Sequence, residues 1–143
     1  MKTKDSFAQH STSRIYAIRL RPGEDLKDCL EKFATENRTK AAVIITCVGS
    51  LGQYNLRYAN QKEACSGKGH FEIVSLVGTL SESSAHLHLS ISDESGITTG
   101  GHLLDKNIIY TTAEIAIAEL TDLIFDRQID ETSGYRELQI RKK

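Results

Sequence analysis

The sequence has almost no net charge. Its 18 lysines and arginines are balanced by 19 aspartates and glutamates, which leaves a formal charge of −1 over 143 residues. A protein that binds nucleic acid through many phosphate contacts usually carries a basic excess, so this composition disfavours direct DNA binding. The basic tail Arg141–Lys143 offers too few phosphate contacts for more than weak, salt-sensitive binding.

Cysteines and long apolar runs are also scarce. Cys29, Cys47 and Cys65 are odd in number and show no CxxC spacing, so we expect reduced thiols rather than a disulfide framework. No apolar run approaches the roughly 20 residues that a membrane-spanning helix needs, and the first residues lack the apolar segment of a signal peptide. We therefore expect a cytoplasmic protein without membrane association, with a nuclear location open if a partner carries it there.

Hydrophobic patterning predicts one domain over residues 13–141, preceded by a polar, flexible leader at residues 1–12. Helical spacing of apolar residues predicts an amphipathic helix over 25–37. The apolar, β-branched run at 41–48 predicts a central strand buried on both faces, which a turn at 49–52 ends. The polar, glycine-bearing composition of residues 59–69 predicts a loop. Alternation or β-branched content predicts further strands at 14–20, 53–58, 71–80, 86–92, 97–104, 122–129 and 135–141.

The order of these elements indicates the fold class. Residues 108–120 mix β-branched residues with a possible helical face, so the sequence leaves their type open. The remaining order is a strand, a helix, a strand and then a run of strands, without a second clear crossover helix. This order favours an α+β (mixed α/β) fold, with a mainly antiparallel sheet flanked by one or two helices, over a doubly wound parallel sheet.

Three of the five histidines, His86, His88 and His102, form a candidate metal site. In a strand, His86 and His88 point to the same face, roughly 6–7 Å apart. A tight turn at 93–96 pairs residues whose numbers sum to about 189, which places His88 opposite the Gly101–His102 region. Neutral imidazoles bind zinc and related divalent ions, and three protein ligands leave one coordination position open. The alternative is a polar sheet face that carries three incidental imidazoles.

Two neighbouring features complete the candidate site. Glu72 points opposite to Phe71 and Ile73, so it shares the polar face of the histidines if the two strands pair. There it could orient an imidazole or act as a general base, the alternative being a cross-strand salt bridge or an intersubunit contact. The pair Gly100-Gly101 is expected for steric reasons, because glycine lets a backbone pass close to its neighbours.

Several stretches resemble the PPC (plant and prokaryote) domain family, whose plant members carry AT-hook DNA-binding motifs. The segment from Gly69 to Gly78 is similar to the family's GRFEIL-SLSG stretch. The segment 86–90, together with Gly96 and 100–103, is similar to the HxH and GGH block of bacterial and archaeal members. The opening at 14–33 also fits, so the resemblance covers roughly residues 13–141.

The resemblance implies an α/β domain with a mainly antiparallel sheet that assembles as a homotrimer. It also implies metal ligands at His86, His88 and His102, since some prokaryotic members hold a metal there. His70 stands where plant members have an arginine in a motif associated with partner contacts. The AT-hook core Arg-Gly-Arg-Pro is absent, because the only proline is Pro22.

Three hypotheses for function follow. The first is a stand-alone PPC-like domain with a three-histidine site for a divalent metal, zinc above all, that acts as a binding or regulatory module with a small-molecule ligand. The second is a metal-dependent hydrolase or lyase acting on a small molecule, so whether the chain is an enzyme stays open. The third is a DNA-associated regulator that acts through partner proteins.

Overall fold

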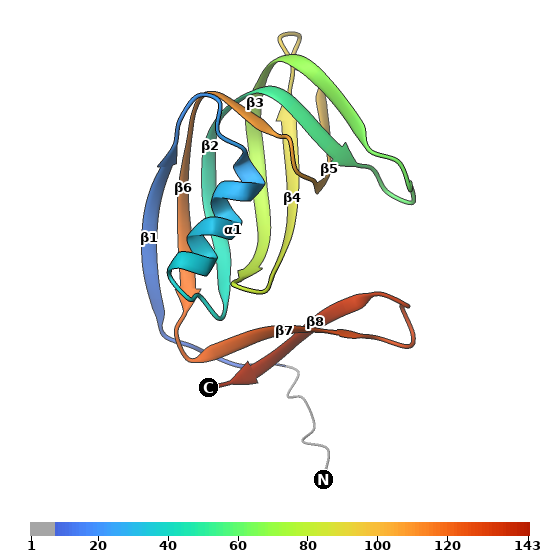
Figure 1. Cartoon of the computed structure of the whole chain (residues 1–143). Helices are drawn as coiled ribbons and strands as arrows, with labels where there is room; N and C mark the ends of the chain where they lie inside the picture. The colour runs from blue at the N-terminus through green and yellow to red at the C-terminus, as the bar shows by residue number, and fades with distance from the viewer. Residues whose placement is uncertain (1–7) are drawn as a thin grey trace.

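The computed structural model describes residues 8–143 and consists mainly of antiparallel β-sheet (Figure 1). The six strands of the main sheet lie in the order β1-β6-β2-β3-β4-β5, and the last two strands form a separate hairpin, β7-β8. The elements in chain order are β1 (Ser13–Leu20), α1 (Leu26–Glu36), β2 (Ala42–Arg57), β3 (Cys65–Ser81), β4 (Ser84–Ser92), β5 (Thr98–Leu103), β6 (Ile108–Leu120), β7 (Leu123–Ile129) and β8 (Arg136–Lys142).

The sheet is curved, and its long strand β2 pairs with three other strands at different points along its length. β2 pairs with β6 and β3 along its length, and its last two residues also pair with β5, through Leu56 opposite Leu103 and Arg57 opposite His102. This last pairing joins the edge strand β5 back to β2, so that β2, β3, β4 and β5 form a partly closed barrel. Register shifts in β2 between residues 44 and 53 mark bulges, which bend a strand and increase its twist.

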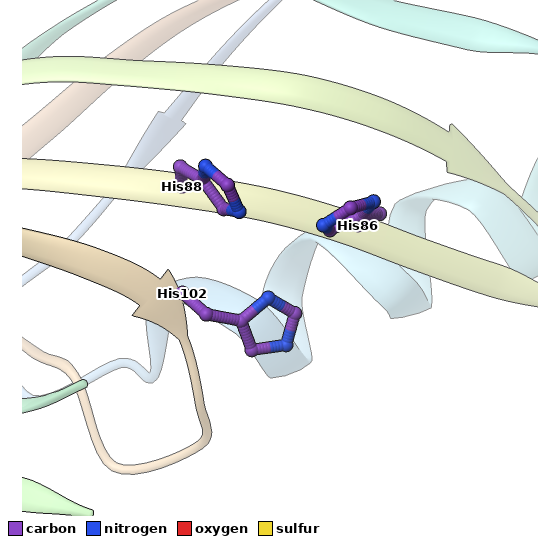
Figure 2. Close-up of side chains that lie close together, drawn as sticks. All are labelled: His86, His88 and His102. Atoms are coloured by element: carbon purple, nitrogen blue, oxygen red, sulfur yellow. The ribbon is translucent and has the colours of Figure 1, made fainter. Parts of the chain in front are cut away.

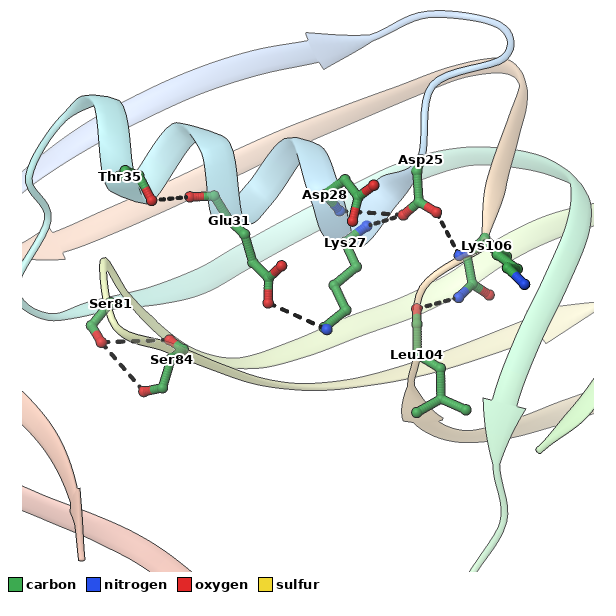
Figure 3. Close-up of polar contacts among 10 residues, drawn as sticks. Asp25, Lys27, Asp28, Glu31, Thr35, Ser81, Ser84, Leu104 and Lys106 are labelled. Carbon is green, nitrogen blue, oxygen red and sulfur yellow. Dashed lines mark hydrogen bonds and ion pairs between the residues drawn. The ribbon is translucent and has the colours of Figure 1, made fainter. Parts of the chain in front are cut away.

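The helix α1 covers one face of the sheet (Figure 1). Asp25 caps its N-terminus by accepting hydrogen bonds from the backbone N–H groups of Lys27 (3.0 Å) and Asp28 (3.2 Å), as Figure 3 shows. Leu26, Leu30 and Ala34 recur at helical spacing and are fully buried against the sheet. The sequence of α1 therefore directs one apolar stripe into the core.

The opposite face of the sheet, here called the open face, is covered by no helix of the described residues (Figure 1). Its apolar side chains alternate with residues that point into the core, so they project outward. Each of them is about half exposed or more, and together they are Ile15, Ile45, Val48, Val74, Val77 and Tyr110. The prediction that residues 41–48 are buried on both faces is therefore wrong for a single chain, since Ile45 and Val48 are 52% and 57% exposed.

The predicted α+β class with one or two flanking helices is also wrong. Within residues 8–143, strands hold 62% of the residues and helix only 8%, with one helix of 11 residues. The main reason is that residues 108–120, ambiguous in the sequence, form the strand β6, whose buried residues at 109, 113, 115 and 117 fall on one face. Within residues 8–143, no helix has the length and hydrophobicity to cross a membrane.

Smaller differences concern the boundaries of individual strands and loops. Residues 49–52, predicted as a turn, lie inside β2, because bulges accommodate the extra residues without ending the strand. The predicted loop at 59–69 ends early, since β3 begins at Cys65. All three cysteines are unpaired thiols, as expected. Of the predicted leader, residues 1–7 lie outside the described part of the chain.

Candidate metal centre

Strands β4 and β5 bring three histidines together on the face of the sheet opposite α1. On β4, His86 and His88 alternate with the buried residues Leu87 and Leu89, so both imidazoles point outward. His88 lies directly opposite His102 of β5, within the region that the turn at 93–96 predicts. One ligand nitrogen from each ring lies within 4.8 Å of the others, and Figure 2 shows the three side chains gathered beside the two strands. The predicted convergence of the three histidines is confirmed.

The surroundings of the cluster keep two of these imidazoles neutral. Burial is the main cause that lowers the pKa of His102 to about 4, and the positive charge of Arg57 is the next largest. Burial is also the main cause that lowers the pKa of His86, with the positive charge of Arg127 second. At pH 7 these rings therefore carry unprotonated nitrogens, which is the form that binds a metal ion.

The donor set fits a divalent ion. A tetrahedral zinc ion lies about 2.0–2.1 Å from each imidazole nitrogen, which places those nitrogens about 3.4 Å from one another. The three nitrogens here lie within 4.8 Å, and His88 is exposed while His86 and His102 are partly exposed. Binding of one ion by all three rings would therefore require the side chains to rotate toward one another. Three imidazoles leave a fourth coordination position for water or another ligand.

Glycines let the strands that carry the histidines approach closely. A Cβ at Gly78, whose φ is +143°, would stand 2.0 Å from the carbonyl oxygen of His86. A Cβ at Gly101 would stand 2.6 Å from the carbonyl oxygen of Arg57. The steric role expected for Gly101 is thus confirmed, and Gly78 plays the same role on the other side of β4.

Glu72 does not join the histidines within one chain. It pairs with Ser92 near one end of the β3–β4 ladder, whereas His88 pairs with Val77. Five residues of strand separate Glu72 from Val77, which is about 16 Å. Glu72 instead lines a different cavity, of about 450 Å³, together with His70 and Tyr110, whose rings are stacked with centroids 4.5 Å apart.

The two largest of the cavities that the histidines line adjoin each other. The first, of about 510 Å³, is lined by all three imidazoles, by Arg57 and by Tyr135. The second, of about 410 Å³, shares His86, His102, Arg57 and Tyr135 with the first. It adds side chains of the β7-β8 hairpin, which are Arg127, Arg136 and Glu137.

Sequence reasoning missed the arginines of these cavities. Arg57 joins the site through the pairing of β2 with β5, and Arg127 through the placement of the hairpin against β3. Both contacts link segments far apart in the sequence. No local spacing signals either of them, so the chain offers no motif from which these residues could have been found.

Comparison with known proteins identifies relatives over most of the chain. The family model described as the Plants and Prokaryotes Conserved (PCC) domain matches residues 7–121. The bifunctional protein GlmU of Synechococcus sp. (strain JA-3-3Ab) is 45% identical over 129 residues, which cover 90% of this chain and 21% of that protein. The chain thus spans about a fifth of the length of the curated relatives it matches.

Solved structures extend the similarity to the fold. A hypothetical protein from Salmonella cholerae-suis has a TM-score of 0.93 and 44% sequence identity, with 94% of this chain and 98% of that chain covered. A metal-containing protein from Archaeoglobus fulgidus has a TM-score of 0.76 and 25% identity, with 91% and 96% covered. Both similarities extend over more than nine tenths of this chain.

Proposed function

The chain belongs to the Plants and Prokaryotes Conserved (PCC) domain family, and we propose that it is a metal-dependent binding module whose histidine cluster holds a divalent ion, zinc. The observation that carries this proposal is the convergence of His86, His88 and His102, with their ligand nitrogens within 4.8 Å. The description of the Archaeoglobus fulgidus relative as metal-containing supports it. When bound, the ion supplies an open coordination position and Lewis acidity to a small molecule in the adjoining cavities.

A binding role is favoured over catalysis by the distribution of carboxylates. A hydrolase or lyase needs a general acid or base within hydrogen-bond reach of the reacting atoms. Glu72, the residue predicted for this role, lines a different cavity. Among the residues that line the two cavities at the histidines, Glu137 is the only carboxylate. The metal-dependent enzyme therefore stands as the second candidate, with Glu137 as the residue on which it depends.

Zinc titration of the metal-free protein tests the proposed site. The protein is made without an affinity tag, stripped with a chelator and titrated in a calorimeter. We expect one zinc ion per chain, and a loss of affinity on the order of a hundredfold in His88→Ala and in His102→Ala, since each removes one of three ligands. His70→Ala is the matched control, because His70 is an exposed histidine outside the cluster. Equal zinc affinity in His88→Ala and the unsubstituted protein would exclude the site.

We also propose that the chain forms the homotrimer that its family resemblance implies, with the open face buried between subunits. Six apolar side chains on that face, contributed by β1, β2, β3 and β6, are exposed in the single chain. A monomeric soluble protein rarely leaves such a group of apolar side chains on one surface, whereas an interface buries it. Val77 of this face pairs with His88, so the proposed interface reaches the edge of the histidine cluster.

The mass of the protein in solution tests the assembly. Light scattering after size-exclusion chromatography is expected to give three times the chain mass of 15.9 kDa. Val48→Lys places a charge on the open face and is expected to lower the mass toward that of one chain. Ile97→Lys is the control, because Ile97 is 68% exposed in the turn between β4 and β5. A monomeric unsubstituted protein, or an unchanged mass in Val48→Lys, would contradict the proposal.

A further inference from the structure

Two arginines are held directly beside the histidine cluster. Arg57 is the cross-strand partner of His102, so both side chains leave the sheet on the same face. Arg127 of β7 donates a hydrogen bond from Nη2 to the hydroxyl of Thr79 at 3.0 Å, and Thr79 is the cross-strand partner of His86. The strand register therefore fixes one guanidinium at each side of the cluster.

These guanidinium groups have no carboxylate partner in the part of the chain that the structure describes. The six ion pairs of residues 8–143 involve neither Arg57 nor Arg127. The Arg127 side chain also donates a hydrogen bond from Nη1 to the carbonyl oxygen of Arg136 at 3.4 Å. Both arginines also line the cavities that open at the histidines. Their charges are thus directed toward the space where a ligand would lie.

The positive charges of the two arginines oppose the binding of a cation at the histidine cluster. A divalent ion among the three imidazoles would add to the charges of Arg57 and Arg127, while Glu137 is the only carboxylate that lines the cavities. Like charges in a partly buried site repel one another, so the metal-loaded cluster keeps an excess of positive charge. An anion that contacts both the ion and the arginines would balance it.

We propose that the small molecule bound at this site carries an oxyanion, a carboxylate or a phosphate group, that occupies the open position of the metal ion and pairs with Arg57 and Arg127. This inference rests on the metal site proposed above. The planar guanidinium group matches both oxyanions through paired N–H donors. Cavities of about 510 and 410 Å³ fall within the range that accommodates small ligands.

The hairpin β7-β8 contributes to this specificity from outside the region that the family model covers. That region ends at residue 121, whereas Arg127 and Tyr135 belong to the hairpin that follows. The metal ligands thus come from the shared domain and one anion-binding arginine from the segment beyond it. The choice of ligand in this chain therefore depends on both the shared domain and the β7-β8 hairpin.

Cobalt substitution separates metal binding from anion binding. Co²⁺ loaded into the metal-free protein gives a visible spectrum that changes when the fourth ligand changes, so acetate and inorganic phosphate can be titrated against it. We expect both the Arg57→Gln and the Arg127→Gln variant to raise the Kd of the better-bound anion about tenfold or more. Each is also expected to bind Co²⁺ more tightly, because a repelling charge is removed. Arg21→Gln is the control, because Arg21 lines neither cavity.

The outcomes distinguish the two proposals. If Co²⁺ binds and anions leave its spectrum unchanged, or if both arginine variants bind acetate and phosphate as the control does, the oxyanion proposal is overturned and the metal site stands. If Co²⁺ does not bind to the histidines, both proposals fail. Arg57→Lys keeps the charge and loses the paired donors, so an intermediate Kd supports recognition of an oxyanion. The relative Kd of acetate and phosphate shows which of the two groups the site prefers.

Discussion

Replacing Gly78 with alanine should destabilise the protein and displace the histidine cluster. The new Cβ would stand 2.0 Å from the carbonyl oxygen of His86 and 2.9 Å from the Cα of Leu87, both backbone atoms of the paired strand. Residue 78 also has a φ of +143°, which an L side chain rarely adopts. The backbone strain costs about 1–3 kcal/mol and the overpacking about 1–3 kcal/mol, so we expect a loss of about 2–6 kcal/mol in the free energy of unfolding.

Urea-induced unfolding, followed by circular dichroism at one protein concentration, measures this loss. Gly96→Ala is the matched control, because Gly96 has a φ of +78° but a Cβ there would meet nothing within 4 Å. It should lose only the backbone contribution, about 1–2 kcal/mol. Gly78→Ala should also bind Co²⁺ more weakly, since the strand must shift at His86. A loss in Gly78→Ala no larger than that in Gly96→Ala would refute the reasoning that close strand approach positions the cluster.

Four further results are expected. Asn107→Ala should cost about 3–5 kcal/mol of unfolding free energy in a urea titration, because the buried Asn107 side chain bonds the backbone N–H and C=O of Asn55 and the C=O of Leu104. Asp25→Ala should cost about 1 kcal/mol or more in the same assay, since it removes the cap of α1. Burial raises the pKa of Cys47 to about 11, so the thiolate fraction still increases above pH 9. The rate at which iodoacetamide alkylates Cys47 in the folded protein, measured by mass spectrometry, should therefore continue to rise above pH 9. A labelled DNA duplex should not shift at physiological salt, given the net charge of −1.

The sequence was sufficient to predict the histidine cluster because the cluster depends on local structure. His86 and His88 share a face through the two-residue period of a strand, and a short turn ties their strand to that of His102. Arg57 and Arg127 were beyond prediction, since their positions depend on pairings between distant segments. Glu72 was placed on the correct face of β3, but its distance from His88 along that strand depends on a register that sequence spacing does not supply.

The prediction of the fold class was wrong for a related reason. Residues 108–120 combine β-branched residues with alanines and glutamates, a composition that suits either a strand or a helix. They become β6 because β1 and β2 flank them and satisfy their backbone hydrogen bonds. The apolar run at 41–48 has the composition of a strand covered on both faces, yet α1 covers only one. In the proposed trimer, the second cover comes from another subunit.

The measurement that tests the central claim most directly is anomalous diffraction at the zinc edge from crystals of the tag-free, zinc-loaded protein. We predict one strong anomalous peak per chain, within bonding distance of the imidazole nitrogens of His86, His88 and His102. Crystals of His88→Ala grown in the same way should lose that peak. A zinc-loaded crystal with no peak at the three histidines, or with its zinc bound elsewhere, would contradict the account.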